Sequence, residues 1–310
     1  MSFQIKYLKY KNKYLDLKNS LTQKGGSTST NNSSSGGGNN NDSGEIIDSQ
    51  QIRDYLHSGK YDFKLFDINY TNQEQESIDN FKIEKKCEYI HTGTITSINA
   101  LNAFLSDIGH NTKEDVDNLE QIILNLIKKV LEGYNMEDFY LIIRARTPYS
   151  EFDIPRWHRD GAYFDHSVIT SKFATVLKGP GTLFIKSSTS NSEKFNEIND
   201  RENEERRMKR ERPGIRFTSE EQQEINERYR TLYAALPKNS DMVQSGKNQG
   251  VIFFADSGGV QGAIHSEPKI DENRIFISIV PGTKENIDER IRREEMYMKM
   301  REAEDKKGKE

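Results

Sequence analysis

The residues with the clearest chemical potential lie in residues 154–165, "IPRWHRDGAYFD". This stretch holds the chain's only tryptophan, Trp157, next to His158, and Asp160 follows two positions later. If the segment is extended, His158 and Asp160 point to one side while Arg159 points to the other. An imidazole beside a carboxylate forms either a hydrogen-bonded pair or two ligands of a metal ion that needs a third.

His265, in "GVQGAIHSEP", is the candidate third ligand. It lies near the end of a short predicted strand, and Arg274 opens the next predicted strand, "RIFISIV", nine residues later. Two histidines and one carboxylate on one face of a metal leave positions open for a substrate and dioxygen, as in non-haem Fe(II) oxygenases. Asp256, just before the His265 strand, is a candidate partner that orients a ligand.

This ordered set resembles the Fe(II)/2-oxoglutarate-dependent dioxygenase superfamily over roughly residues 139–282. The resemblance implies a double-stranded β-helix, or jelly roll, in which His158, Asp160 and His265 bind Fe(II). It also implies 2-oxoglutarate as co-substrate, and a basic residue on the last strand, here Arg274, to hold its distal carboxylate through paired hydrogen bonds. Many members carry Ser or Thr two residues after that arginine, where this chain has Phe276.

Two alternatives stay open. A lysine on a middle strand, Lys178 or Lys186, could hold 2-oxoglutarate instead of Arg274, as in some relatives of this fold. The histidines and the aspartate could also be structural, because a carboxylate often orients a buried imidazole. We therefore expect a dioxygenase that hydroxylates or demethylates an unidentified substrate. The alternative is a non-catalytic jelly-roll protein with a structural or interaction role in a virus.

The elements that must position these residues change character at residue 139. Beyond it, short apolar runs such as "FYLIIRART", "SKFATVLKG" and "GVIFFADS" are bounded by turn residues, which favours an antiparallel sandwich or barrel. Before it, residues 112–134 predict an amphipathic helix that Thr112 caps with Asp115 at its third position. The sequence predicts an α+β domain over residues 45–282, with a helical N-terminal lead-in and a jelly-roll core.

A charged insertion, about residues 187–248, interrupts the strands. Its segment "RENEERRMKRER" has ten charged residues of twelve, and the mixed signs favour a solvated helical insertion over a nucleic-acid-binding arm. We expect that residues 190–235 can be shortened without loss of metal binding. Residues 283–310 predict a charged helix that ends in a tail.

The first 44 residues have a different composition. Residues 1–24 carry six lysines and one aspartate, a local net charge of +5, in an amphipathic pattern. We expect a basic helix that docks on this protein or a partner, or binds an anionic surface. The lysine- and tyrosine-rich leader resembles those of proteins from giant amoeba-infecting viruses. Residues 25–44 contain only Gly, Ser, Thr, Asn and Asp, which predicts a flexible linker.

The overall composition narrows the protein class. One cysteine, Cys87, excludes an intramolecular disulfide, and no apolar run approaches the roughly 20 residues of a membrane-spanning helix. We expect a soluble intracellular protein, in the host cytoplasm or the virion if it is viral. The net charge of −4 gives nucleic acid only weak support as a partner. Neither the substrate nor the oligomeric state follows from the sequence.

Overall fold

The computed structural model describes residues 46–148, 155–161, 163–212, 218–236 and 241–307. These belong to one compact unit, Gly44–Glu310. The basic leader 1–24 and the linker 25–44 lie outside the described residues, so their predicted roles stay predictions. In chain order the described elements are α2 (Ser49–Leu56), β1 (Phe63–Asp67), α3 (Asn72–Asn80), β2 (Cys87–Thr94), η1 (Ile95–Ser97), α4 (Leu101–Asp107), α5 (Lys113–Tyr134), β3 (Asp138–Arg146), β4 (Ser171–Lys178), β5 (Leu183–Ile185), α6 (Thr189–Arg210), α7 (Ser219–Ala234), β6 (Met242–Gln244), β7 (Gln249–Phe254), β8 (His265–Ser266), β9 (Arg274–Gly282) and α8 (Lys284–Lys307).

The larger sheet has six strands in the order β1-β7-β4-β9-β3-β2, and all its neighbouring strands are antiparallel. Both edge strands, β1 and β2, come from the lead-in, which is therefore only partly helical and not the helical segment that we predicted. The polarity of β2 hides it in the sequence, because it buries His91 and exposes Ile90. Mixed helices and antiparallel strands agree with the predicted α+β class.

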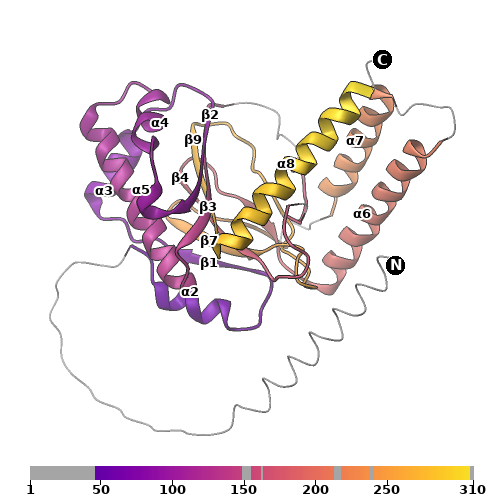
Figure 1. The fold of residues 1–310 in the computed structure, drawn as a ribbon, viewed down its shortest axis with the longest axis horizontal. Helices are drawn as coiled ribbons and strands as arrows, with labels where there is room; N and C mark the ends of the chain where they lie inside the picture. The colour runs from indigo at the N-terminus through magenta and orange to yellow at the C-terminus, as the bar shows by residue number, and fades with distance from the viewer. Residues whose placement is uncertain (1–45, 149–154, 162, 213–217, 237–240, 308–310) are drawn as a thin grey trace, which may run out of the picture. The chain divides into compact units, whose positions relative to one another are not determined.

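Helices α2–α5 cover one face of the larger sheet (Figure 1). Helix α5 starts at the predicted cap, where Thr112 and Asp115 exchange side-chain to backbone hydrogen bonds. Its apolar stripe, including Leu119, Ile123 and Ile127, is fully buried in one core with the residues of β3 and β9 that face the helices. Burial of each such side chain contributes roughly 1.5–3 kcal/mol, so this layer anchors the sheet.

The other face of the larger sheet meets a small antiparallel sheet of three strands in the order β6-β5-β8. Phe184 of β5 and Ala263, just before β8, pack in one buried cluster with Ala174, Val251 and Phe253 of the larger sheet. The metal-ligand candidates lie beside this cluster. The small sheet is made of strands of two or three residues, so most of its support comes from neighbouring layers.

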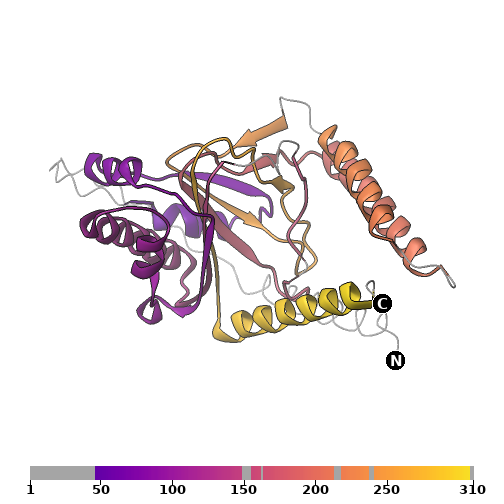
Figure 2. The same cartoon turned by 90° about the horizontal axis from the view of Figure 1, so that it is seen from above.

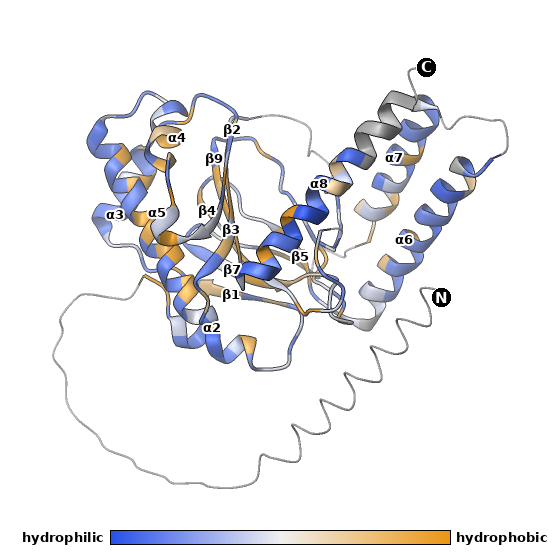
Figure 3. Ribbon diagram, in the orientation of Figure 1, coloured by the Kyte–Doolittle hydropathy of each residue, from blue (hydrophilic) through white to orange (hydrophobic). Residues whose placement is uncertain are grey.

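Helices α6 and α7 lie within the charged segment 187–248, together with β6, and pack against one another. We call this pair the hairpin. It and α8 lie on the side of the larger sheet opposite to α2–α5 (Figure 2). Both are mainly hydrophilic, whereas the strands of the larger sheet are mainly hydrophobic (Figure 3). Among the helices of the described residues, none combines the length and apolar character that crossing a membrane requires.

Candidate metal centre

Two distant chain segments meet at the candidate site. The segment around His158 runs beside β8, and the two histidines form an antiparallel bridge. The backbone N–H of His158 donates to the carbonyl of His265, and the N–H of His265 donates to the carbonyl of His158, each over 2.9 Å. A bridged pair of this kind faces the same side of the sheet, and the ring centroids are 4.3 Å apart.

The backbone also fixes which nitrogen of each ring is available. Nδ1 of His158 lies 2.8 Å from the carbonyl oxygen of Arg156, and Nδ1 of His265 lies 3.0 Å from that of Ala263. A carbonyl oxygen only accepts, so both Nδ1 atoms carry the proton and donate to it. Nε2 is therefore the nitrogen of each ring that is left to bind a metal, as in other sites where the second ring nitrogen donates to a carbonyl.

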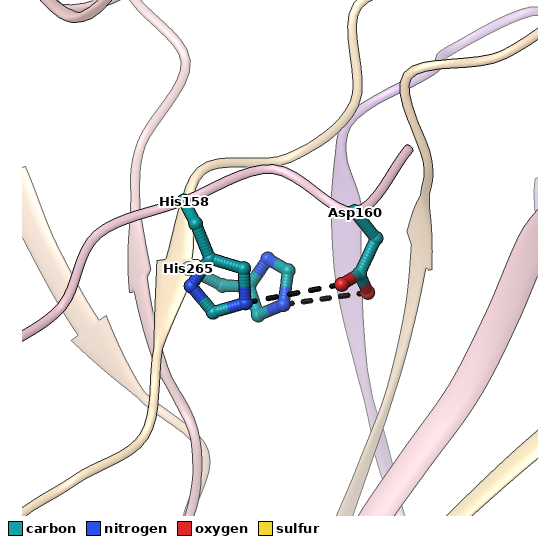
Figure 4. A group of neighbouring side chains, drawn as sticks. All are labelled: His158, Asp160 and His265. Atoms are coloured by element: carbon teal, nitrogen blue, oxygen red, sulfur yellow. Dashed lines mark ion pairs between the residues drawn. The ribbon is translucent and has the colours of Figure 1, made fainter. Parts of the chain in front are cut away.

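Asp160 completes the group. One carboxylate oxygen lies 3.8 Å from Nε2 of His158, and the other lies 3.5 Å from Nε2 of His265 (Figure 4). One potential ligand atom from each residue can be chosen so that all lie within 4.8 Å of one another. Within the described residues this is the only group of three or more His, Cys, Asp or Glu side chains close enough to hold a metal ion.

Asp256, the predicted orienting residue, connects the two segments through its backbone and its carboxylate. Its N–H donates to the carbonyl of Asp160 over 2.6 Å, and its Oδ1 accepts from the N–H of Gly262 over 2.6 Å. A side chain at Gly262 would collide with the carbonyl oxygen of Phe254, which lies 2.6 Å from the position of the missing Cβ. This close approach holds the turn before His265 against the backbone of residues 254–256, and Asp256 in turn is bonded to Asp160.

Lys172 of β4 is a functional candidate that sequence reasoning missed. Its ammonium forms an ion pair with Asp160 and lies 4.7 Å from the centre of the Phe253 ring. Burial by itself raises the pKa of the Asp160 carboxyl. Lys172 and the two histidines outweigh burial and hold that pKa well below its usual range. The carboxylate therefore stays ionised, as metal coordination requires.

The environment of His265 keeps its imidazole neutral. The side chain is 6% exposed, and it contacts the rings of Phe184 and Phe253. Burial, followed by the proximity of His158, lowers the pKa of His265 to about 3, although Asp160 acts in the opposite direction. His158 is more open, with 42% of its side chain exposed, so the group faces outward on that side.

The three basic residues predicted to hold 2-oxoglutarate lie in different places. Arg274 is buried on the face of β9 that also carries Phe276, and its guanidinium lies 4.8 Å from the centre of the Phe276 ring. Phe276 packs on the cluster that includes Phe184 and Phe253, the aromatic neighbours of His265. Arg274 therefore shares an interior face with the metal-ligand candidates.

Lys178 and Lys186 are not brought to that face. The Lys178 ammonium donates to the carbonyls of Asp79 and Phe81, over 2.7 and 2.9 Å, next to α3. A register shift between Val176 and Lys178 interrupts the strand alternation that would have turned Lys178 inward. Lys186, just after β5, has an exposed side chain.

No family model matches the sequence, and no curated protein is similar to it in sequence. Solved structures with a similar course of the chain include a prolyl-4-hydroxylase from Pseudomonas putida, at 10% identity and a TM-score of 0.35, covering 76% of this chain and 99% of that one. The Kdo hydroxylase KdoO, a non-haem Fe(II) α-ketoglutarate-dependent dioxygenase with Fe(III) and succinate, matches at 12% identity and a TM-score of 0.37, over 76% and 84% of the two chains.

A third similar structure is the auxin dioxygenase DAO1 from Arabidopsis thaliana with 2-oxoglutarate, at 8% identity and a TM-score of 0.34, covering 75% of this chain and 86% of that one. KdoO is also known with cobalt(II). KdoO depends on Fe(II) and α-ketoglutarate, and the DAO1 structure contains 2-oxoglutarate. His158, Asp160 and His265 of this chain form a group that could hold a metal ion. Likeness at this level assigns no activity, so the side-chain geometry has to indicate the function.

Proposed function

We propose that the protein is an Fe(II)- and 2-oxoglutarate-dependent dioxygenase with a jelly-roll core. The observation that carries the proposal is the convergence of one potential ligand atom from each of His158, Asp160 and His265 to within 4.8 Å of one another. Two neutral imidazoles and one carboxylate are the donor set of mononuclear non-haem iron sites. The two facing antiparallel sheets support the jelly-roll assignment.

The donor set fits a ferrous ion in both chemistry and protonation. Each Nδ1 donates to a backbone carbonyl, which leaves Nε2 of each ring to bind the metal, and Lys172 keeps Asp160 ionised. Three ligands on one side leave further positions for a chelating co-substrate and dioxygen. An iron ion bound there supplies the activation of dioxygen that hydroxylation or demethylation requires.

Arg274 is the residue that we assign to the distal carboxylate of 2-oxoglutarate. Its side chain is buried, and its guanidinium lies 4.8 Å from the centre of the Phe276 ring. The Nε–H of Arg274 donates to the carbonyl of Pro180 over 2.8 Å, which orients the guanidinium. A guanidinium binds a carboxylate through two parallel hydrogen bonds, which suits this role. Lys172 is the second candidate, because it also lies on the interior face.

The alternative, a non-catalytic jelly roll, explains less of the geometry. A structural His-Asp pair needs only one imidazole and one carboxylate, whereas here two rings with the same fixed tautomer face one carboxylate. His158 is also partly exposed, which a purely structural histidine does not require.

Metal binding by purified protein tests the proposal. Isothermal titration with Co(II), a redox-stable substitute for Fe(II), should give one site per chain, and Asp160→Ala should abolish it. Asp165→Ala is the matched control, because Asp165 lies on the same loop but outside the group of three. Equal Co(II) binding by wild type and Asp160→Ala would contradict the assignment of these ligands.

A further inference from the structure

The hairpin contacts the first metal-ligand segment through the residues that alternate with the ligands. Trp157 and Arg159 flank His158, and both contact the hairpin rather than the interior. Trp157 is 3% exposed and lies in a buried cluster with Phe195 of α6 and Ile225 of α7. The segment therefore presents one face to the candidate metal centre and the opposite face to the hairpin.

Arg159 extends this contact between the two ligands His158 and Asp160. Its guanidinium lies 4.8 Å from the centre of the Phe195 ring, and it donates to Oδ1 of Asn196 over 2.6 Å. Both partners are consecutive residues near the start of α6. The stacking on Phe195 and the hydrogen bond to Asn196 together restrain the planar guanidinium of Arg159. The restrained side chain in turn restrains the backbone between the two ligands.

The second ligand segment has the same two-faced arrangement. Ile264 immediately precedes His265 and is buried in the cluster that contains Trp157. Ile185 follows Phe184, which stacks on His265, and belongs to that cluster too. The remaining buried members of the cluster are Tyr229 and Tyr233 of α7 and Leu236, which lies two residues after the end of α7.

The backbone alone holds these segments weakly. Strand β8 has two residues, β5 has three, and the His158 segment joins β8 through a single bridge. Pieces this short are not stable without packing on both faces. The interior cluster covers one face, and the hairpin covers the other.

We infer that the hairpin is a positioning element for the metal ligands, and that Phe195 and Asn196 are its central positioning residues. The inference rests on the proposed function, because it concerns the metal affinity of the same three ligands. It argues against the expectation that residues 190–235 can be shortened without loss of metal binding. Apolar residues of both hairpin helices pack in one buried cluster with residues of both ligand segments.

Two independent readouts test this on the full chain. Trp157 is the only tryptophan, so its emission maximum reports whether the hairpin covers the ligand segment. Calorimetric titration with Co(II) reports the dissociation constant of the metal. Phe195→Ala should shift the emission to longer wavelength and weaken Co(II) binding about 10- to 100-fold, the usual effect of losing a group that orients metal ligands.

Asn196→Ala is a milder variant, because it removes only the side chain that accepts the hydrogen bond from Arg159. It can be measured even if Phe195→Ala fails to fold. It should weaken Co(II) binding, and Asn196→Asp should restore the affinity because a carboxylate also accepts from Arg159. Two controls separate positioning from general stability. Met208→Ala changes a residue that is 60% exposed on α6, and Leu105→Ala creates a cavity in the distant α4 core. Both should keep the wild-type dissociation constant, although Leu105→Ala should melt earlier.

The outcomes separate the inference from the proposed function. Wild-type protein that binds Co(II), with unchanged affinity in Phe195→Ala or Asn196→Ala, would overturn the inference alone. Equal weakening in Leu105→Ala would also overturn it, because the effect would then be general destabilisation. Wild-type protein that binds no Co(II) would overturn the proposed function and, with it, the positioning role.

Discussion

His158 and His265 are more than one hundred positions apart in the sequence, yet they exchange two backbone hydrogen bonds of 2.9 Å. The pairing places both Nε2 atoms opposite one carboxylate, that of Asp160. The site is thus a property of the sheet register. A one-residue slip would turn one histidine to the hairpin side and destroy the group.

Arg274→Met tests the assignment of the co-substrate anchor. The variant should bind Co(II) like wild type but lose roughly 1.5–3 kcal/mol of 2-oxoglutarate affinity, because a carboxylate loses a charge-assisted hydrogen-bond partner. Titration of the Co(II)-loaded protein with 2-oxoglutarate measures this. Lys178→Met is the matched control and should bind 2-oxoglutarate normally, since its ammonium is held by the carbonyls of Asp79 and Phe81. Normal binding in Arg274→Met, with a loss in Lys172→Met, would transfer the role to Lys172.

Lys172→Met tests the ion pair beside the metal centre. The substitution leaves the largely buried Asp160 carboxylate without its cation, which should lower the free energy of unfolding at pH 7 by roughly 3 kcal/mol. Added Co(II) should recover much of that loss, because a divalent ion also compensates the carboxylate. Thermal melts with and without Co(II) check both effects, and Lys269→Met, on an exposed lysine, should melt like wild type. A loss of stability that Co(II) does not reduce would count against metal binding at Asp160.

Asp62→Asn tests a pH dependence away from the metal centre. Burial raises the pKa of Asp62 above its ordinary 3.8, although hydrogen bonds from Ser187 and Phe63 act in the opposite direction. At pH 7 the Asp62 carboxylate is ionised, and burial makes its charge more costly in the folded state than in the unfolded state. Asp62→Asn removes that cost, so the variant should melt at a higher temperature. The gain should fade as the pH is lowered towards 3.8, where the wild-type group becomes protonated in both states. Glu76→Gln, on the exposed surface of α3, controls for the change in net charge. A gain that does not depend on pH would contradict the assignment.

The candidate ligands could be predicted because short strands impose a simple alternation. His158 and Asp160 are two positions apart and their side chains meet at one site. Arg274 stands on the opposite face of β9 from Ile275, Ile277 and Ile279. These relationships need only the period of a strand. The same period would have singled out Lys172 on β4, which alternates with the buried Phe173.

The predictions that differ from the structure concern features that the two-residue period of a strand does not determine. The register shift after Val176 turns Lys178 away from the interior face, and the sequence contains no residue that predicts this shift. The edge strands β1 and β2 have faces of mixed polarity, so they escape the pattern of a half-buried strand. The hairpin has few apolar residues, and their importance appears only when Trp157 and Ile264 are seen to lie beneath them.

Turnover of 2-oxoglutarate without a substrate tests the central claim most directly. Anaerobic protein with Fe(II) and 2-oxoglutarate should develop a weak visible charge-transfer band. Admission of air, with ascorbate as reductant, should then yield succinate slowly and in proportion to the protein. Asp160→Ala should give neither the band nor succinate, and Asp165→Ala should give both. Folded wild-type protein that produces no more succinate than Asp160→Ala would contradict the dioxygenase assignment.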